Sequence, residues 1–535
     1  MSEAGSATIE SLSGDRASRR PLELFAAIFV AAGLIYSFHL GANALGASEA
    51  FSAWSAAKPG IAAIAQTPVL HEPGKFLFYY AALHYYTRIF GLSEISLRSM
   101  SVIFSLATLA LVFALGCEMF DESTALAAAA MWAFNPFAVA FAHTARMYPM
   151  LIAIALAHLL TLLRVRSRPG IMGGIGCGIL GAAMPYTHMA GLLILGAEAA
   201  ILLRDLSRGR RDTIAWMAII LAGVLFVPYI PYAIRQSQQM IYGQWLDYLG
   251  PAYNYPLAVK AAAALVAALV TLWLVFGRAV ERDGNEPMRV LVAWIGLPAL
   301  AFIVGSVILH PMLNLRYLSP GLAASSLLIA AVIGAASGKW RNLLAVGFVV
   351  ACLLLLPFAQ TKPQPWRDLA GQVTAGGASE PVFFESGFVS NENTASIPNG
   401  GFPFGFYSVP FNYYFKGTNP RIAIPGYDPD TARLTIEERV SSAGGGWLVS
   451  WKDSNAVISE LPDPKRFRVV EKFRGDHLTF YRITPATNAE PTVGSAPPWA
   501  GVTPAPAVKG ESAPPRNAGG VYPKYSKGPV GRVRG

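Results

Sequence analysis

Residues suited to acid–base and phosphate chemistry gather in one stretch of the chain, between residues 42 and 97. This stretch contains Ser48-Glu49-Ala50 and then His71-Glu72-Pro73-Gly74-Lys75, followed by an aromatic run over 76–80. A carboxylate can orient or deprotonate an attacking hydroxyl, and a cation can stabilise a departing phosphate. The stretch therefore predicts a reactive site rather than a simple connection between helices.

The composition shows what surrounds this site. The 535 residues are 53% hydrophobic and only 14% charged, and their mean hydropathy is +0.42. A soluble domain carries about 25% charged residues, and apolar runs of about 20 residues are typical of membrane-spanning helices. The net charge of +10 then reflects arginines that set membrane topology, not a nucleic-acid partner. The sequence predicts an α-helical polytopic membrane protein.

The apolar runs predict a transmembrane domain over residues 21–361, after a cytoplasmic segment over 1–20. The expected spans are 22–41, 98–117, 124–142, 148–164, 171–188, 190–204, 213–232, 257–277, 289–309, 317–336 and 341–358. Arginine clusters such as 164–168 and 208–211 fall on one side, so we expect the N-terminus inside. The short aromatic run 76–90 is expected to lie along the membrane surface as an interfacial helix.

The composition changes after residue 361. Short β-rich segments over 381–384, 421–424, 447–451, 467–470 and 478–481, with a helical pattern over 431–442, predict a small mixed α/β domain over 362–485. The topology places this domain outside the cell membrane. Residues 486–535 are rich in Pro, Gly, Ala and Ser and predict a disordered tail.

Some polar residues lie on the predicted outer side, against the positive-inside trend. Arg146 and Tyr148 follow the third span, and Arg316 and Tyr317 precede a late span. A guanidinium can bind phosphate oxygens in a bidentate way, although an interfacial arginine can also simply snorkel toward water. His188 lies at a predicted junction between a helix and a loop and is a weaker candidate, since a lone histidine is more often structural.

Several of these motifs, in this order, resemble the GT-C glycosyltransferases of the family-39 type. That group includes bacterial relatives of the protein O-mannosyltransferases and of the lipid A aminoarabinose transferase. The matching segments are Ser48-Glu49, His71-Glu72-Pro73-Gly74, Leu97-Arg98-Ser99, Ala145-Arg146-Met147-Tyr148, Arg316-Tyr317 and Pro365-Trp366-Arg367. The resemblance covers about residues 20–370, and more loosely extends to 485.

The resemblance implies an inverting transfer of one sugar, a hexose or a pentose, from a polyprenyl-phosphate carrier to an acceptor on the outer face of the cytoplasmic membrane. It makes Glu49 the expected catalytic acid. The remaining candidates, from the matching motifs or from their own position, are expected to bind the donor or the acceptor: Glu72, His71, Lys75, Arg146, Tyr148, His188, Arg316 and Tyr317. The family has Asp where this chain has Ser48. Either Glu49 takes over that work, or the acceptor differs, or activity has been lost.

Two other functions stay open. A transporter of lipid-linked sugars would need ionisable groups in mid-membrane, and Glu198 is the main exception to their scarcity here. A non-catalytic scaffold would keep the fold without the reaction. No cofactor is expected besides the donor, and no motif has metal-ligand spacing, although two acids in one loop leave divalent-metal binding open. The sugar and the acceptor (lipid, polysaccharide or protein) are not encoded in any motif.

Overall fold

The structure is a computed structural model. It describes residues 3–65, 77–234, 286–308, 315–336, 338–359, 364–386, 405–425, 429–450, 461–475 and 478–486. The predicted span at 257–277 and the predicted tail, apart from its first residue, lie outside these ranges. Residues Met1–Ala486 form one compact unit by their own contacts; the boundary at 361 between a membrane part and an α/β part remains a prediction.

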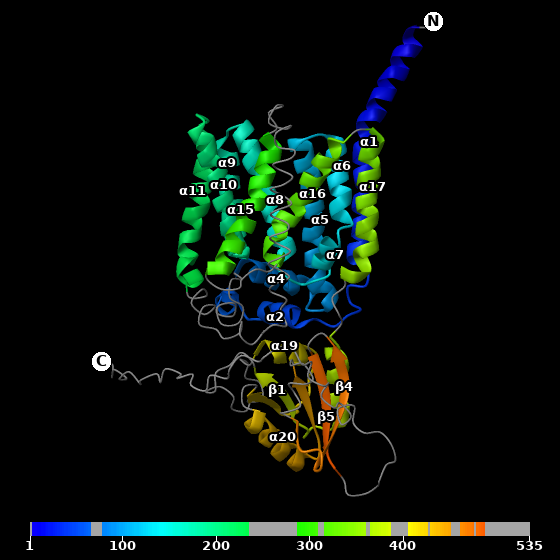
Figure 1. The fold of residues 1–535 in the computed structure, drawn as a ribbon, viewed down its shortest axis with the longest axis vertical. Helices are drawn as coiled ribbons and strands as arrows, with labels where there is room; N and C mark the ends of the chain where they lie inside the picture. The colour runs from blue at the N-terminus through cyan, green and yellow to red at the C-terminus, as the bar shows by residue number, and fades with distance from the viewer. Residues whose placement is uncertain are drawn as a thin grey trace, which may run out of the picture. The chain divides into compact units, whose positions relative to one another are not determined.

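Most of the described chain is helical, and the helices of one bundle run side by side (Figure 1). They are α1 (Glu3–Ser37), α5 (Glu94–Met119), α6 (Glu122–Ala133), α7 (Pro136–Ala142), α8 (Tyr148–Ser167), α9 (Ile171–Thr187), α10 (Ala190–Ser207), α11 (Thr213–Phe226), α15 (Glu286–Ile308), α16 (Ser319–Gly334) and α17 (Gly338–Leu355). Short 3-10 turns stand at Val227–Tyr229, Leu315–Leu318 and Leu356–Ala359.

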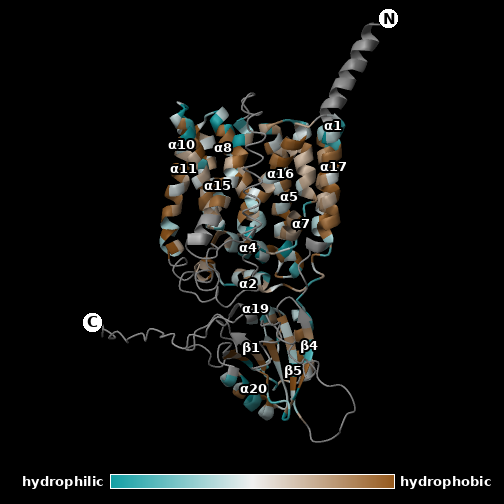
Figure 2. Ribbon diagram, in the orientation of Figure 1, coloured by the Kyte–Doolittle hydropathy of each residue, from teal (hydrophilic) through white to brown (hydrophobic). Residues whose placement is uncertain are grey.

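Their composition fits a multi-pass membrane protein. Six helices in the described residues are long and apolar enough to cross a membrane, or up to seven if each bent pair is one span. Figure 2 shows hydrophobic residues along the lengths of these helices. Helices occupy every predicted span that the structure describes, but the full number of eleven spans remains a prediction.

The predicted third span, 124–142, is not one straight helix. It consists of α6 and α7, bent by 60° at a short break. Pro136 has no backbone N–H and disfavours helical geometry in the residue before it. Asn135 stands in that position, extended, and its side chain caps α7 by accepting from the N–H of Phe137 at 2.9 Å. The break ends the α6 ladder and redirects the chain toward the turn that carries Arg146.

Glycines bring α9 close to its neighbour α11. A Cβ atom added to Gly178 would stand 2.7 Å from Leu221, and one added to Gly181 would stand 2.8 Å from Ala222. Both distances are too short for real side chains, so these positions set the separation of the two helices.

Two short helices belong to the stretch between α1 and α5. They are α2 (Ala47–Ala56) and α4 (Leu77–Phe90). One side of α4 buries Tyr80, Leu83 and His84, while Tyr85 and Ile89 are exposed. The helix runs across the direction of the spanning helices (Figure 1) and is too short to be counted among the candidate spans. The structure thus supports the predicted interfacial helix.

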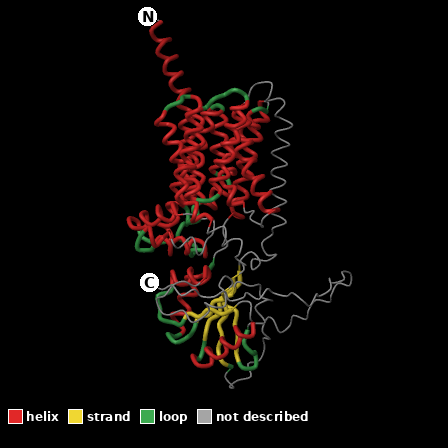
Figure 3. Tube along the Cα trace, turned by 90° about the vertical axis from the view of Figure 1, so that its left-hand side faces the viewer, coloured by secondary structure: helices red, strands yellow, loops and turns green. Residues whose placement is uncertain are grey.

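The later part of the chain forms a five-stranded mixed sheet with the strand order β2-β1-β3-β5-β4. The strands are β1 (Val382–Ser386), β2 (Arg421–Pro425), β3 (Gly446–Ser450), β4 (Phe467–Gly475) and β5 (Leu478–Pro485), and the helices are α18 (Trp366–Gly376), α19 (Gly405–Tyr414) and α20 (Pro429–Ala443). Strand β1 is parallel to β2 and β3, and β5 is antiparallel to β3 and β4. Figure 3 shows these strands in yellow. The strand positions and α20 agree with the sequence prediction; α18 and α19 were not predicted.

The sheet buries both of its faces. Val382 and Phe384 pack with Trp366 of α18 and Phe411 of α19, whereas the intervening Phe383 packs against α20. Alternate residues of a strand point to opposite faces, so an apolar run of this kind requires a cover on each side.

Candidate functional site

Glu49 is buried at the beginning of α2. It is the third residue of that helix, and its Oε2 accepts a hydrogen bond from the N–H of Gly46 at 3.0 Å. Gly46, in extended conformation, is the N-cap. Ser48, although serine often caps helices, is therefore not the cap of this helix. The helix begins earlier, so that Ser48 is already inside the first turn and Glu49 closes the cap.

Arg98 is the principal partner of Glu49. Its Nε donates to Oε1 and its Nη2 to Oε2, each at 2.8 Å, and both side chains are buried. The same guanidinium donates to the carbonyl oxygens of Leu40, Asn43 and Ala44 at 2.6 to 3.2 Å. Arg98 thus holds the end of the first span and the start of α2 together.

Arg98 lies near the start of α5, which begins at Glu94 after its N-cap Ser93, four residues before the expected span 98–117. It was not among the expected site residues. The available signal was an arginine on the side that the positive-inside rule leaves poor in arginine.

The turn before α8 joins the same cluster. The N–H of Ala145 donates to Glu49 Oε1 at 2.9 Å, and Arg146 Nη1 donates to the carbonyl oxygen of Ser48 at 2.7 Å. Arg146 is 3% exposed, so it does not snorkel to water. We call Glu49, Arg98 and Arg146 the charge cluster. It contains two guanidinium groups and one carboxylate, which gives it a net positive charge.

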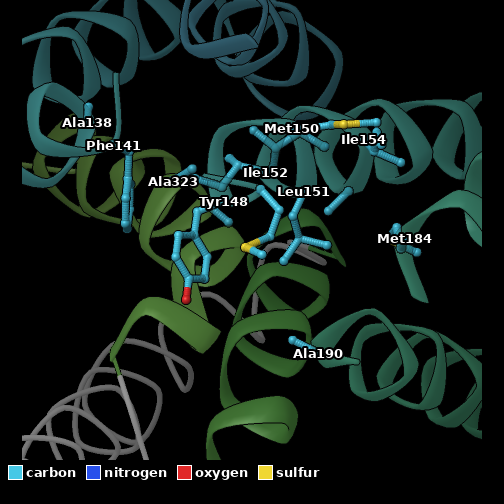
Figure 4. Packing of buried hydrophobic residues seen from close by; sticks show 14 of the residues in the cluster. Ala138, Phe141, Tyr148, Met150, Leu151, Ile152, Ile154, Met184, Ala190 and Ala323 are labelled. Atoms are coloured by element: carbon cyan, nitrogen blue, oxygen red, sulfur yellow. The ribbon is translucent and has the colours of Figure 1, made fainter. Parts of the chain in front are cut away.

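Three further expected residues lie close to each other. The rings of His188 and Tyr317 are 4.9 Å apart, and those of His188 and Tyr148 are 5.9 Å apart. We call these three residues the aromatic trio. Tyr148 opens α8, two residues after Arg146, and Figure 4 shows it beside Phe141 of α7 and Ala323 of α16.

His188 has a defined tautomer in this arrangement. Its Nδ1 accepts a hydrogen bond from the N–H of Ala190 at 3.1 Å, so the neutral ring carries its proton on Nε2. His188 also ends α9 as its C-cap, and it is 1% exposed. The sequence expectation of a helix–loop junction is confirmed, and the ring is both a structural element and a member of the trio.

The remaining expected residues are less well placed. Arg316 is exposed in the 3-10 turn before α16, next to Tyr317 of the trio. His71, Glu72 and Lys75 lie outside the described residues, so their roles remain predictions.

A second set of contacts connects α2 and α5 to the region of the sheet, where α19 packs on α2. The N–H of Leu45 donates to Tyr414 Oη at 2.6 Å, and that hydroxyl donates to Glu94 Oε1 at 2.9 Å. Arg367 Nη2 donates to the same carboxylate oxygen at 2.7 Å. Burial raises the pKa of Tyr414, and the hydrogen bond to Glu94 raises the pKa of Arg367. The stretch that precedes Glu49 is therefore held by Arg98 and by Tyr414.

An apolar pocket lies beside the aromatic trio, between α10, α15 and α16. Tyr317 and Phe302 line it near the trio, and Ile194, Trp294 and Ser325 line it farther along the helices. No group of acidic, histidine or cysteine side chains in the described ranges could hold a metal ion. The charge cluster can bind an anion, and the apolar pocket can hold a hydrocarbon chain attached to it.

These features define a multi-pass helical membrane protein with a buried, positively charged site at one end of its bundle. A family model described as dolichyl-phosphate-mannose-protein mannosyltransferase matches residues 73–232, which confirms the resemblance expected from the sequence. No curated protein matches the chain.

Solved structures confirm the GT-C fold. ArnT from Cupriavidus metallidurans in the apo state matches with a TM-score of 0.54 and 13% identity, over 87% of this chain and 98% of that one. The same enzyme bound to undecaprenyl phosphate matches with a TM-score of 0.51 and 13% identity, over 89% of this chain and 100% of that one.

Proposed function

We propose that this protein is a membrane glycosyltransferase that moves a single sugar, with inversion, from a polyprenyl-phosphate carrier to an acceptor. The observation that carries the proposal is the charge cluster. A carboxylate and two guanidinium groups, far apart in sequence, are buried together, and the aromatic trio lies between them and an apolar pocket. ArnT, which has the same fold, was solved with undecaprenyl phosphate.

The proposed division of labour follows from charge and polarity. The carrier phosphate lies beside Arg146 and Arg316, since guanidinium groups recognise phosphate oxygens, and the polyprenyl tail enters the apolar pocket. Tyr148, His188 and Tyr317 lie between these two regions and provide aromatic faces and a ring N–H for the sugar. Glu72, His71 and Lys75 are proposed as further contacts on the strength of the family motif alone.

Glu49 is the proposed catalytic carboxylate, but its present hydrogen bonds must change before it can act as a base. Each of its oxygens already accepts two hydrogen bonds, from Arg98 and from the N–H groups of Gly46 and Ala145. Accepting a proton from the acceptor therefore requires one of these donors to leave. Without that exchange, Glu49 positions the loop and orients the acceptor.

The same observation supports the scaffold as a second candidate. A carboxylate with all of its acceptor sites filled, in a chain with Ser48 at the family's Asp position, is also what a protein that kept the fold and lost the reaction would show. The sheet region and α19 would then serve assembly instead of acceptor binding.

We further propose that the charge cluster faces the outside of the cytoplasmic membrane, with the N-terminus inside. The opposite end of the bundle carries the arginine-rich connections, where Arg166 pairs with Asp205 and Asp212. That end also holds Arg204, Arg208 and Arg211, and an excess of arginine marks cytoplasmic loops.

Mass spectrometry of envelope lipids tests the proposal. A deletion strain is complemented with wild type, Glu49→Gln or Arg88→Gln, where Arg88 is an exposed arginine of α4 outside the cluster. We expect a polyprenyl-phosphate sugar to accumulate in the deletion strain, and to be cleared by wild type and Arg88→Gln but not by Glu49→Gln. Unchanged carrier lipids in every strain would reject the transferase and favour the scaffold or a transporter.

A further inference from the structure

A buried polar group lies within the hydrocarbon-spanning part of the bundle, away from the charge cluster. His158 of α8 and Glu198 of α10 approach to 2.7 Å between Nε2 and Oε2, and both side chains are fully buried. Trp294 of α15 donates from Nε1 to Glu198 Oε1 at 2.9 Å. The sequence analysis singled out Glu198 alone, because its partner His158 lies 40 residues earlier in the chain and is adjacent to it only in the fold.

This group is well satisfied. His158 Nδ1 donates to the carbonyl oxygen of Cys177 at 2.9 Å, which leaves one proton between Nε2 and the Glu198 carboxylate. Placing an ionisable group in a membrane interior costs free energy, and apolar residues of similar volume in place of His158 and Glu198 would avoid that cost. The arrangement therefore needs a reason beyond packing, and Trp294 connects it to the apolar pocket.

Trp294 is both a partner of Glu198 and a wall of the apolar pocket. On α15 it is the pocket residue farthest from Phe302, which contacts Tyr317 of the aromatic trio at 5.9 Å between ring centroids. The two positions are eight residues apart, or about 12 Å at 1.5 Å per residue. On α10 the pocket ends at Ile194, one turn before Glu198. The indole thus closes the inner end of the pocket.

We propose that Trp294 is the floor of a pocket for an isoprenoid tail, and that Glu198 and His158 are positioning residues that fix this floor. The proposal rests on the proposed function, which supplies the polyprenyl carrier as the ligand class. Packing alone leaves an indole free to change rotamer, whereas a hydrogen bond to a carboxylate that is itself anchored by His158 holds one orientation. The floor then sets how many isoprene units the protein contacts before the tail must bend out toward lipid.

Direct binding to the purified full-length protein tests this proposal. The probes are polyprenyl phosphates whose tails grow by one isoprene unit at a time, and affinity is measured in detergent by native mass spectrometry. The tail moves from the hydrocarbon of the detergent into the apolar pocket, so each isoprene unit gains free energy from closer packing and not from leaving water. We expect about a twofold gain per unit for wild type until the tail reaches Trp294, and no further gain beyond that length.

The variants separate the floor from general stability. Trp294→Ala should move the plateau to a longer tail, and Glu198→Ala should abolish a sharp plateau. Glu198→Gln keeps an acceptor for the indole and should restore the wild-type length. Trp340→Ala is the matched control, because Trp340 is an exposed tryptophan of α17 outside the pocket. If Trp294→Ala does not fold, Trp294→Leu also lengthens the pocket and takes its place.

Two failures are distinguishable. A plateau at the same tail length in wild type and in the folded Trp294 variant, or a wild-type affinity that never levels off, overturns the floor and leaves the proposed function intact. If no polyprenyl phosphate of any length binds to wild type, the proposed function itself fails.

Discussion

Removing the guanidinium of Arg98 should release the segment over residues 40–49. In Arg98→Met, Glu49 would remain buried without its counter-charge, and the carbonyl oxygens of Leu40, Asn43 and Ala44 would lose their donors. Breaking one partner of a buried ion pair costs about 3–5 kcal/mol. At 1.4 kcal/mol per factor of ten, the fraction of molecules with this segment open should rise by about 100- to 4,000-fold.

Hydrogen–deuterium exchange measures this opening directly. The N–H groups of Gly46 and Ala145 donate to the Glu49 carboxylate, so the peptides that contain them report on the two ends of the contact. We expect much faster exchange of both peptides in Arg98→Met. Arg98→Lys should be intermediate, because an ammonium keeps the charge but offers three donors in place of the five that the guanidinium uses here.

Arg88→Met is the control, because Arg88 is exposed and, within the described ranges, makes one long hydrogen bond, to the carbonyl oxygen of Pro59 at 3.5 Å. Equal exchange in Arg98→Met and Arg88→Met would refute the reasoning. In that case Arg98 does not hold the loop, and the positioning role given to the Glu49–Arg98 pair would have to be abandoned.

Three further perturbations follow from the same structure. Tyr414→Phe removes the hydroxyl that bridges Leu45 and Glu94. A lost buried hydrogen bond costs about 1–3 kcal/mol, so proteolysis between residues 40 and 49 should become about tenfold faster. An unchanged cleavage rate would show that the packing of α19 alone holds this segment. Burial raises the pKa of Tyr413 to about 12 from 10.0, so between these pH values the folded state keeps a proton that the unfolded state loses. The stability contributed by the docked tyrosine is therefore complete below pH 10 and lost as the pH rises through about 12. Limited proteolysis across that range should show release of α19, and protection that does not change with pH would contradict the burial argument. Gly116→Ala should destabilise the contact between α5 and α6, since a Cβ there would stand 2.5 Å from the Cα of Ala125. The thermal unfolding midpoint in detergent should be lower than for the control Gly176→Ala, where an added Cβ meets nothing within 4 Å. Equal midpoints would show that the two helices can move apart.

The sequence predicted the elements better than the contacts among them. Long apolar runs marked the helices, because a segment in lipid must satisfy its own backbone hydrogen bonds. Local breaks were harder to see: Asn135-Pro136 divides a run whose other residues are almost all apolar. The sheet region was predicted in its strands, but α18 and α19 were missed because their apolar residues face a sheet that the local pattern does not reveal.

The candidate site shows the same limit. Tyr148, His188 and Tyr317 were expected individually, and the structure brings them together from three helices. Arg98 and His158 were not among the expected site residues, because its place on the arginine-poor side marked Arg98 without showing its partner, and nothing local distinguishes a histidine in an apolar run from an ordinary one. Each gains its role from a carboxylate that is distant in sequence.

By itself, the sequence determined the class of protein and the chemistry available to it, since hydropathy and residue type are local properties. Only the tertiary structure decided which charges are paired. Burial makes an unpaired charge too costly, so Glu49 must lie against Arg98 and Glu198 against His158 and Trp294. Those pairings, made by helices that meet only in the folded bundle, fix where an anion and an apolar chain can be held side by side.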